Sequence, residues 1–291
     1  MFENILIATD DSQLVKNAIK YTANAFPDAN YHVLNVINTS NKSVPITDIL
    51  MEDLKKASRM AIKDAEDIFN EMGIKKIKKS IGKGIPSEEI VSYSQKHGID
   101  LIVMGTQSKT GTQTHEIGRT CLHVLEHSHV PVLLFDNIVE IKKPKKILHP
   151  SSGSKYSMRA GYLAIKLTKY FDGEVEVLIT QGGGETERTF KEKDLENLTY
   201  LEDLRLETEH AFKKLYEFAK NNDIHYKLKS CSIKPDKDIV EESKKYDLIV
   251  GSMGRPGLKY KLRKIYPPFA VGELEREIIV ESKDPILFVE D

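Results

Sequence analysis

The loop between Gly105 and Gly118 is the stretch of this chain best suited to holding an anion. It follows residues 101–104, a continuous apolar run that predicts a strand buried on both faces of a parallel sheet. A helix is predicted to begin near Gly118, and a second buried strand follows at residues 130–135. Helix N-termini attract phosphate, and ligands of open α/β sheets lie at the carboxyl ends of the strands. An anionic ligand is therefore expected at this loop.

A degraded copy of this strand and loop occurs in the second half of the chain, at residues 247–257. The spacing from Gly118 to Pro131 recurs between Gly272 and Pro285, and the beginnings of the two halves match as well. The repeat covers about half the chain, which is too long for a solenoid repeat and suits a domain. The sequence therefore predicts a tandem duplication.

These residues resemble the universal stress protein family in its tandem, two-domain form, over nearly the whole chain. Nucleotide-binding members of that family carry an aspartate after the first strand and a G-x2-G-x9-G-[ST] loop. In the first half the aspartate is Asp10, and the loop pattern falls on Gly105, Ser108, Gly118 and Arg119. In the second half Ser152 replaces the aspartate, and the pattern falls on Gly251, Gly254, Gly272 and Glu273.

The resemblance implies that the first half binds ATP or another adenine nucleotide. Mg²⁺ could accompany the nucleotide, and no metal site belonging to the protein itself is expected. Asp10 would accept hydrogen bonds from the ribose hydroxyls, and backbone N–H groups near Gly105 and Gly118 would hold phosphate. The expected first-half site comprises Ala8, Thr9, Asp10, Val36, Met104, Gly105, Ser108, Gly118, Arg119 and Thr120.

Some of these positions depart from the family pattern. Ser108 stands where the pattern has glycine, which costs on the order of 1 kcal/mol if its φ must be positive. Arg119 replaces a small hydroxyl residue but can bind phosphate through two donors, and Thr120 could supply a hydroxyl. Asp10 also precedes a predicted helix together with Ser12, so capping of that helix is a second interpretation. A further interpretation is that the loop is degenerate, binds no phosphate and is kept only for the turn that it forms.

The second half is expected to carry a degenerate site that is empty or altered. Glu273 lies at a predicted helix start, where a carboxylate satisfies the helix dipole and repels phosphate. An insertion at about residues 255–271, in which the segment 259–268 adds four positive charges, could be a lid or a partner-binding loop. The degenerate site comprises Pro150, Ser152, Ile179, Val250, Gly251, Gly254, Gly272 and Glu273.

Other chemistry-bearing residues give no further site. His123 and His127 are four apart on a predicted helix, as zinc-binding histidines can be, but no glutamate follows His123 directly. The sequence shows no Ser-His-Asp order, paired-carboxylate motif or P-loop, so no catalytic residues are expected and the chain is more an ATP-binding protein than an enzyme.

The composition sets limits on the partners. With 291 residues and a net charge of −1, the chain suits two domains and argues against nucleic acid or an anionic membrane as a partner. Its two cysteines lie in different halves, which favours a reducing, cytoplasmic setting. No apolar run approaches the length of a membrane span, and the first strand starts too early for a signal peptide.

The expected fold class is α/β, with two tandem adenine-nucleotide α-hydrolase-like (Rossmann-like) domains. Each domain would be a five-stranded parallel sheet between helices. The first domain is expected at residues 1–137, a linker at 138–145 and the second domain at 146–291, with a long charged helix at about 191–221. The terminal strands, near residues 131–135 and 285–289, are expected to pair as an internal pseudo-dimer, because exposed flat edges invite aggregation. A homodimer of whole chains also stays open.

Together these features predict a cytoplasmic stress-response protein that binds an adenine nucleotide in its first half as a regulatory ligand. Two alternatives stay open. One is a nucleotide-free interaction scaffold that uses the 255–271 insertion, and the other is a slow ATP hydrolase.

Overall fold

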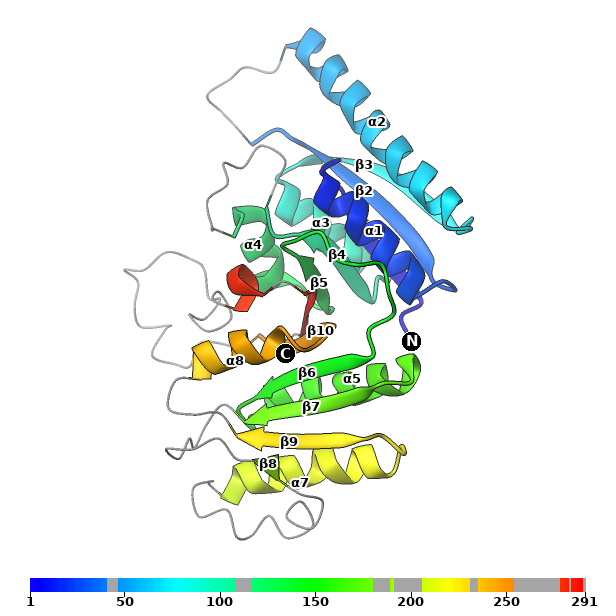
Figure 1. The fold of residues 1–291 in the computed structure, drawn as a ribbon. Coiled ribbons are helices and arrows are strands. Elements are labelled where there is room, and N and C mark those ends of the chain that lie inside the picture. The colour runs from blue at the N-terminus through cyan, green and yellow to red at the C-terminus, as the bar shows by residue number, and fades with distance from the viewer. Residues whose placement is uncertain are drawn as a thin grey trace, which may run out of the picture. The chain divides into compact units, whose positions relative to one another are not determined.

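The computed structural model describes residues 1–40, 47–107, 117–179, 189–190, 206–230, 235–253, 278–282 and 284–289. The chain divides into two compact units, Met1–Lys143 and Pro144–Asp291 (Figure 1). Within the described residues, no helix is long and apolar enough to cross a lipid bilayer.

The sheet of the first unit consists of five parallel strands in the order β3-β2-β1-β4-β5. The strands are β1 (Asn4–Ala8), β2 (Asn30–Asn38), β3 (Ile77–Gly84), β4 (Leu101–Gly105) and β5 (Val132–Phe135). The apolar run at residues 101–104 is buried throughout, as expected for a strand covered on both faces. The predicted five-stranded parallel sheet is confirmed for this unit.

Four helices cover the two faces of this sheet. They are α1 (Gln13–Ala25), α2 (Asp48–Glu71), α3 (Pro86–Lys96) and α4 (Arg119–His127). The helices α1 and α2 pack together on one face, and α3 and α4 pack together on the other (Figure 1). Helix α1 begins where the sequence indicates, because the Ser12 hydroxyl accepts a hydrogen bond from the backbone N–H of Val15 at 3.2 Å.

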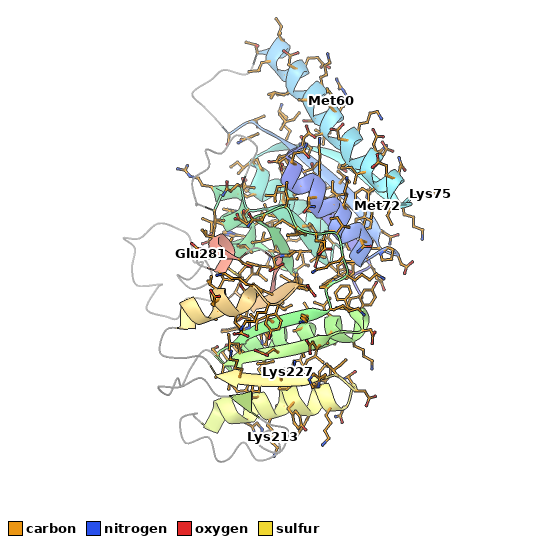
Figure 2. All side chains as sticks on the ribbon, in the orientation of Figure 1. Met60, Met72, Lys75, Lys213, Lys227 and Glu281 are labelled. Carbon is orange, nitrogen blue, oxygen red and sulfur yellow. The ribbon has the colours of Figure 1, made fainter. Side chains whose placement is uncertain are left out.

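Helix α2 extends beyond the sheet it covers. Its 24 residues span about 36 Å, whereas the eight residues of the neighbouring edge strand β3 span about 26 Å. Its first turns therefore have no sheet beneath them, and Ile49 is 79% exposed. Met60 lies on the outer side of the helix and is 61% exposed (Figure 2).

The strand order places a crevice at the carboxyl edge of this sheet. Strand β1 pairs with β2 on one side and with β4 on the other. The chain therefore adds β2 and β3 on one side of β1, and then adds β4 and β5 on the other side. In doubly wound sheets, ligands bind outside the carboxyl ends of the strands at such a reversal point. The residues after β1 and β4 therefore face the region where a ligand is expected.

The second unit also has a parallel sheet, with one exception to the expected pattern. Its strand order is β11-β10-β6-β7-β9-β8. The parallel strands are β6 (Lys146–Ser151), β7 (Glu174–Ile179), β9 (Tyr226–Ser230), β10 (Leu248–Ser252) and β11 (Ile286–Val289). The helices α5 (Lys155–Phe171), α7 (Leu206–Lys220) and α8 (Pro235–Ser243) connect them, and residues 278–281 are also helical.

The exception is β8 (Thr189–Phe190), a sixth strand that pairs antiparallel with β9. The prediction of five parallel strands was therefore wrong in this detail. Pairing with β8 satisfies backbone groups of β9 that would otherwise form an unpaired edge. A strand of two residues is too short to leave an alternating pattern in the sequence, which is why it was missed.

The same carboxylate contact occurs at the start of both sheets. The side chain of Asp100 accepts hydrogen bonds from the backbone N–H groups of Glu3 at 2.9 Å and Asn4 at 3.2 Å. In the second unit, Asp247 Oδ2 accepts from the N–H groups of Lys145 and Lys146, both at 2.9 Å. Asp100 thus connects the start of β4 to the start of β1, and Asp247 connects the start of β10 to the start of β6.

Candidate functional site

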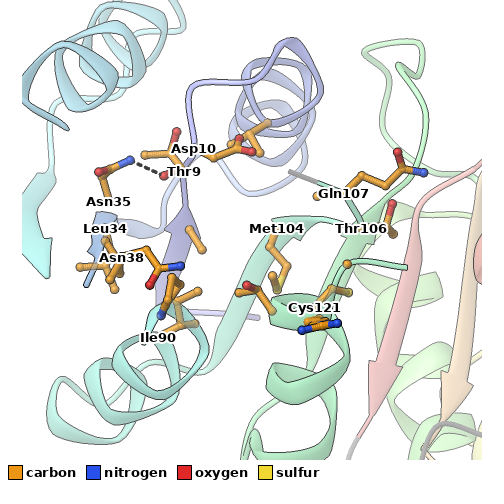
Figure 3. Close-up of a pocket in the computed structure, with 18 residues that line it drawn as sticks. Thr9, Asp10, Leu34, Asn35, Asn38, Ile90, Met104, Thr106, Gln107 and Cys121 are labelled. Carbon is orange, nitrogen blue, oxygen red and sulfur yellow. Dashed lines mark hydrogen bonds between the residues drawn. The ribbon is translucent and has the colours of Figure 1, made fainter. Parts of the chain in front are cut away.

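A cavity of about 410 Å³ lies at the carboxyl edge of the first unit's sheet (Figure 3). Its volume falls within the range of about 300–1,000 Å³ that is usual for small-molecule sites. Strands β1, β2 and β4 and the first turns of α1, α3 and α4 supply its walls. The lining residues are Ala8, Thr9, Asp10, Val15, Leu34, Asn35, Val36, Asn38, Pro86, Ile90, Met104, Gly105, Thr106, Gln107, Gly118, Arg119, Thr120 and Cys121.

Most of the residues expected from the sequence meet around this cavity. The first-half set lines it in full apart from Ser108, which lies outside the described residues. The members that the structure brings together are Ala8, Thr9, Asp10, Val36, Met104, Gly105, Gly118, Arg119 and Thr120. Their role in binding a nucleotide stays a prediction.

Asp10 has a structural role in addition to its position on the cavity. Its Oδ1 accepts a hydrogen bond from the N–H of Ser12 at 3.0 Å, and Thr9 Oγ1 accepts from the N–H of Asp11 at 3.2 Å. Asp11 has a φ of 64°, a conformation that aspartate tolerates better than most residues. Ser12, not Asp10, is the N-cap of α1, so Asp10 shapes the turn that leads into the helix.

Asn35 connects the ends of β1 and β2 beside Asp10. Its side-chain amide donates to the carbonyl oxygen of Thr9 at 2.7 Å (Figure 3), and the N–H of Thr9 donates to Leu34 at 2.9 Å. Sequence reasoning missed both Asn35 and Asn38 as lining residues. Two asparagines interrupt an apolar run near the carboxyl end of β2, but only the strand register shows that they reach the cavity.

The opposite end of the cavity suits an anion. Gly118 is the N-cap residue of α4 and has no side chain with which to cap it, and the first turn of the helix contains no acidic residue. The backbone N–H groups at the start of this helix are therefore not capped by a side chain, and the positive end of the helix dipole lies at the cavity. Arg119, the first residue of α4, adds a positive charge.

Backbone contacts hold this end in place. The N–H of Gly118 donates to the carbonyl oxygen of Thr106 at 2.8 Å, and the N–H of Thr106 donates to Phe135 at 2.9 Å. The Thr106 hydroxyl also donates to the carboxylate of Asp136. The start of α4 is therefore fixed to the end of β4 and, through it, to β5.

The two glycines of the cavity should differ in their tolerance of a side chain. A Cβ on Gly118 would lie 3.0 Å from the Thr106 backbone oxygen, which cannot move without disturbing the end of β4. A Cβ on Gly105 would lie 3.0 Å from Leu14 Cδ2, the end of a side chain that can rotate. Gly118→Ala is expected to lower the free energy of unfolding by about 1–3 kcal/mol, and Gly105→Ala by less. Urea denaturation checks this order, and equal losses would contradict it.

The remaining wall of the cavity is apolar, formed by Leu34, Val36, Ile90, Met104 and Cys121. The Cys121 thiol is 1% exposed. Burial, together with the nearby Asp136 carboxylate, raises its pKa, so that the thiol stays protonated and unreactive at neutral pH. This wall can accept a flat apolar group but offers no nucleophile.

The expected second-half residues lie at the equivalent edge of the second unit. Strand β6 lies between β10 and β7, and their carboxyl ends carry Pro150, Ile179, Val250 and Gly251, with Ser152 just after β6. The turn of the first unit recurs there, because Ser152 Oγ accepts a hydrogen bond from the N–H of Ser154 at 3.4 Å. The accepting group is a hydroxyl in this unit and a carboxylate in the first. The other expected residues, Gly254, Gly272 and Glu273, and the 255–271 insertion lie outside the described residues.

The histidines of α4 contact each other. The rings of His123 and His127 stack with centroids 4.1 Å apart, and His127 Nδ1 donates to the carbonyl oxygen of His123 at 2.9 Å. Across the part of the chain that the structure describes, no group of three His, Cys, Asp or Glu residues is placed to hold a metal ion.

Comparison with known proteins identifies the family. The model of the universal stress protein family matches residues 1–136. Universal stress protein MJ0531 of Methanocaldococcus jannaschii is 32% identical over 152 residues, which cover 50% of this chain and 85% of that protein. Universal stress protein MJ0577 of the same organism is 29% identical over 158 residues, covering 46% of this chain and 94% of that protein.

A solved structure is similar to this chain in fold. The crystal structure of a universal stress protein from Archaeoglobus fulgidus DSM 4304 covers 99% of this chain and 96% of its own, with a TM-score of 0.74 and 18% identity. At this identity the likeness concerns the fold alone, and it agrees with the α/β architecture of the described residues. The sequence match to MJ0531, at 32% identity over 85% of that protein, shows that the chain belongs to the universal stress protein family.

Proposed function

We propose that this protein binds an adenine nucleotide, ATP foremost, in the cavity of the first unit and that the nucleotide acts as a regulatory ligand. The observation that carries the proposal is the arrangement of one cavity into three chemically different parts. The start of α4 at Gly118 and Arg119, a carboxylate at Asp10 and an apolar slot at Val36 and Ile90 all face the same space.

The strand order supports the assignment of these three regions of the cavity to the phosphates, the ribose and the base of a nucleotide. Strand β1, which carries Asp10, lies between β2 and β4. The phosphates would lie on the β4 side, at the start of α4, and the base on the β2 side, against Val36 and Ile90. Asp10 would accept hydrogen bonds from the ribose hydroxyls in between.

The lining of the cavity favours a regulatory ligand over rapid catalysis. Among the described lining residues Asp10 is the only carboxylate, and none is a histidine or lysine that could serve as a general base. Because Asp10 is assigned to the ribose, away from the phosphates at the start of α4, it is poorly placed to activate a water that attacks phosphate. A bound ATP would instead hold the ends of β1, β2 and β4 and the start of α4 in one arrangement.

Analysis of nucleotide released from the purified protein tests this proposal. Denaturation followed by chromatography should release adenine nucleotide, and no release together with no binding of added ATP would favour the scaffold alternative. Turnover above ~1 per minute would favour the hydrolase alternative, although this rate is still below that of most enzymes.

We also infer that the two units arose by duplication, since they share their turns as well as their order of elements. Ser12 and Ser154 both cap the helix after the first strand of their unit, accepting from the backbone N–H three residues later. The changes from Asp10 to Ser152 and from Asp11 to Gly153 leave the equivalent turn of the second unit without a carboxylate. This difference supports nucleotide binding in the first unit and not in the second.

A further inference from the structure

We propose that the protein pairs with a second copy of itself through the outer face of helix α2, with the two α2 helices antiparallel. The contact is made by four residues in one row along the helix, called here the α2 stripe. They are Ile49, Asp53, Lys56 and Met60. None of them lines the cavity of the first unit, so this inference does not depend on the proposed nucleotide function.

The α2 stripe lies on the side of the helix opposite the core. With 3.6 residues per turn, its four residues fall within an arc of about 60° around the helix axis. The buried residues of the helix lie on the other side of that axis, and they are Ser58, Ala61, Ile62, Ala65 and Phe69. The stripe therefore faces away from the sheet that α2 covers.

Both ends of the stripe are apolar and exposed. Ile49 is the most exposed of the large apolar residues that the structure describes, and Met60, on the outer side of the helix in Figure 2, is third after Ile138. The solvent-facing side of a surface helix is usually polar. Single exposed apolar residues are common on proteins, so the argument depends on how these two are arranged with the charges between them.

That arrangement is self-complementary. In a pair of identical chains related by a two-fold axis, residue i contacts residue j of the partner, and j contacts i in return. With the axis midway between positions 54 and 55, Ile49 faces the partner's Met60 and Asp53 faces the partner's Lys56. Each of these contacts occurs twice. The dimer would thus contain two apolar contacts at the ends and two ion pairs in the middle.

Charge selects the antiparallel direction. In a parallel pair each Asp53 would face another Asp53 and each Lys56 another Lys56, and like charges would oppose each other. Asp53 and Lys56 are exposed, and within the described residues neither has an ion-pair partner. The adjacent Glu52, in contrast, pairs within its own helix with Lys55 at 3.7 Å and with Arg59 at 2.9 Å.

The extension of α2 beyond the sheet leaves room for the partner. Residues 48–57 contain no buried side chain, and burial begins only at Ser58. In the antiparallel pair, the helix of the partner continues past the N-terminal end of α2, so the two sheets lie at opposite ends of the contact. The contact is about 17 Å long, or three turns. This is smaller than a standard interface, so a weak dimer with a Kd on the order of 10–100 µM is expected.

Sedimentation velocity over a range of about 5–500 µM protein, which brackets this Kd, tests the inference. Asp53→Lys and Lys56→Asp each place like charges opposite each other at two positions, so each should raise the Kd about tenfold or more. The double variant Asp53→Lys/Lys56→Asp restores opposite charges, and its Kd should return to within about threefold of the wild type. Glu71→Lys makes the same charge change at an exposed residue of α2 outside the stripe and should leave the Kd unchanged.

Disulfide cross-linking tests the direction of the pair. A mixture of Ile49→Cys and Met60→Cys proteins should form a disulfide-linked dimer on mild oxidation, and neither variant should do so alone. The wild type, which has Cys121 and Cys231, is the control for other disulfides. Linkage of Ile49→Cys to itself would contradict the antiparallel pair. A monomer at every concentration, a dimer that neither charge reversal weakens, or a double variant as weak as the single ones would overturn the inference.

Discussion

Replacing Asp10 or Arg119 by alanine should each weaken ATP binding about ten- to a hundredfold. A hydrogen bond to a charged group contributes about 1.5–3 kcal/mol, which corresponds to that range of affinity. Asp10 would lose its contact with the ribose hydroxyls, and Arg119 its contact with the phosphates at the start of α4. Titration calorimetry on both variants and on the wild type measures the change.

Two further variants make this result interpretable. Asp10→Asn keeps an oxygen that can accept from the N–H of Ser12 and so preserves the turn, but it loses the negative charge. It should therefore fold as stably as the wild type and still bind ATP more weakly. Ser152→Ala, at the matching turn of the second unit, should leave the affinity unchanged. If only Ser152→Ala weakens binding, the nucleotide lies in the second unit and the proposed site is wrong.

Lowering the pH from 6.5 toward 4 should destabilise the second unit through His149. The ring of this histidine on β6 is completely buried. Its Nδ1 donates to the carbonyl oxygen of Val250 at 2.7 Å, while its Nε2 has no hydrogen-bond partner within the described residues. Gly161 on α5 makes room for the ring, since a Cβ there would lie 3.0 Å from Nε2. Burial lowers the pKa of His149 to about 4, and the backbone carbonyl groups nearby offset this only in part.

The sign of the effect follows from the two pKa values. In the unfolded chain His149 titrates near 6.5, so between pH 6.5 and 4 the unfolded state binds a proton that the folded state excludes. The stability that neutral His149 provides is therefore complete above pH 6.5 and is lost progressively down to about pH 4. The loss over this range is on the order of 3 kcal/mol.

Hydrogen exchange at pH 7.5 and pH 5, corrected for the intrinsic exchange rate, can detect this loss in β6 and β10. His32 on β2 of the first unit also has a pKa lowered mainly by burial, so the control is a variant of His149 itself and not the first unit. His149→Asn retains a donor for Val250 but removes the titrating group, so its β6 and β10 amides should lose less protection at pH 5. Equal losses in the wild type and in His149→Asn would show that another group is responsible.

Local sequence signals predicted most of the fold. The buried strands β1, β4 and β5 were found because continuous apolar runs of this length occur where both faces of a sheet are covered. Helix starts followed from the capping chemistry of Ser12 and from Pro86 in the first turn of α3. The cavity residues from β1, β4 and α4 followed from the glycine loop and from the rule that ligands lie at carboxyl ends of strands.

The features that sequence reasoning missed depend on contacts between distant segments. Asn35 and Asn38 reach the cavity because β2 continues past the end of β1, and only the strand register reveals this extension. The short strand β8 forms because β9 offers an edge, not because of a pattern in its own residues. Likewise, the burial of His149 depends on Gly161, which is twelve residues away on another element.

A crystal structure of the protein grown with ATP tests the proposed function most directly. It should show nucleotide in the cavity of the first unit, with the base against Val36 and Ile90, the ribose at Asp10 and the phosphates at Gly118 and Arg119. Nucleotide at the carboxyl edge of the second unit, or an empty first-unit cavity at millimolar ATP, would contradict the proposal.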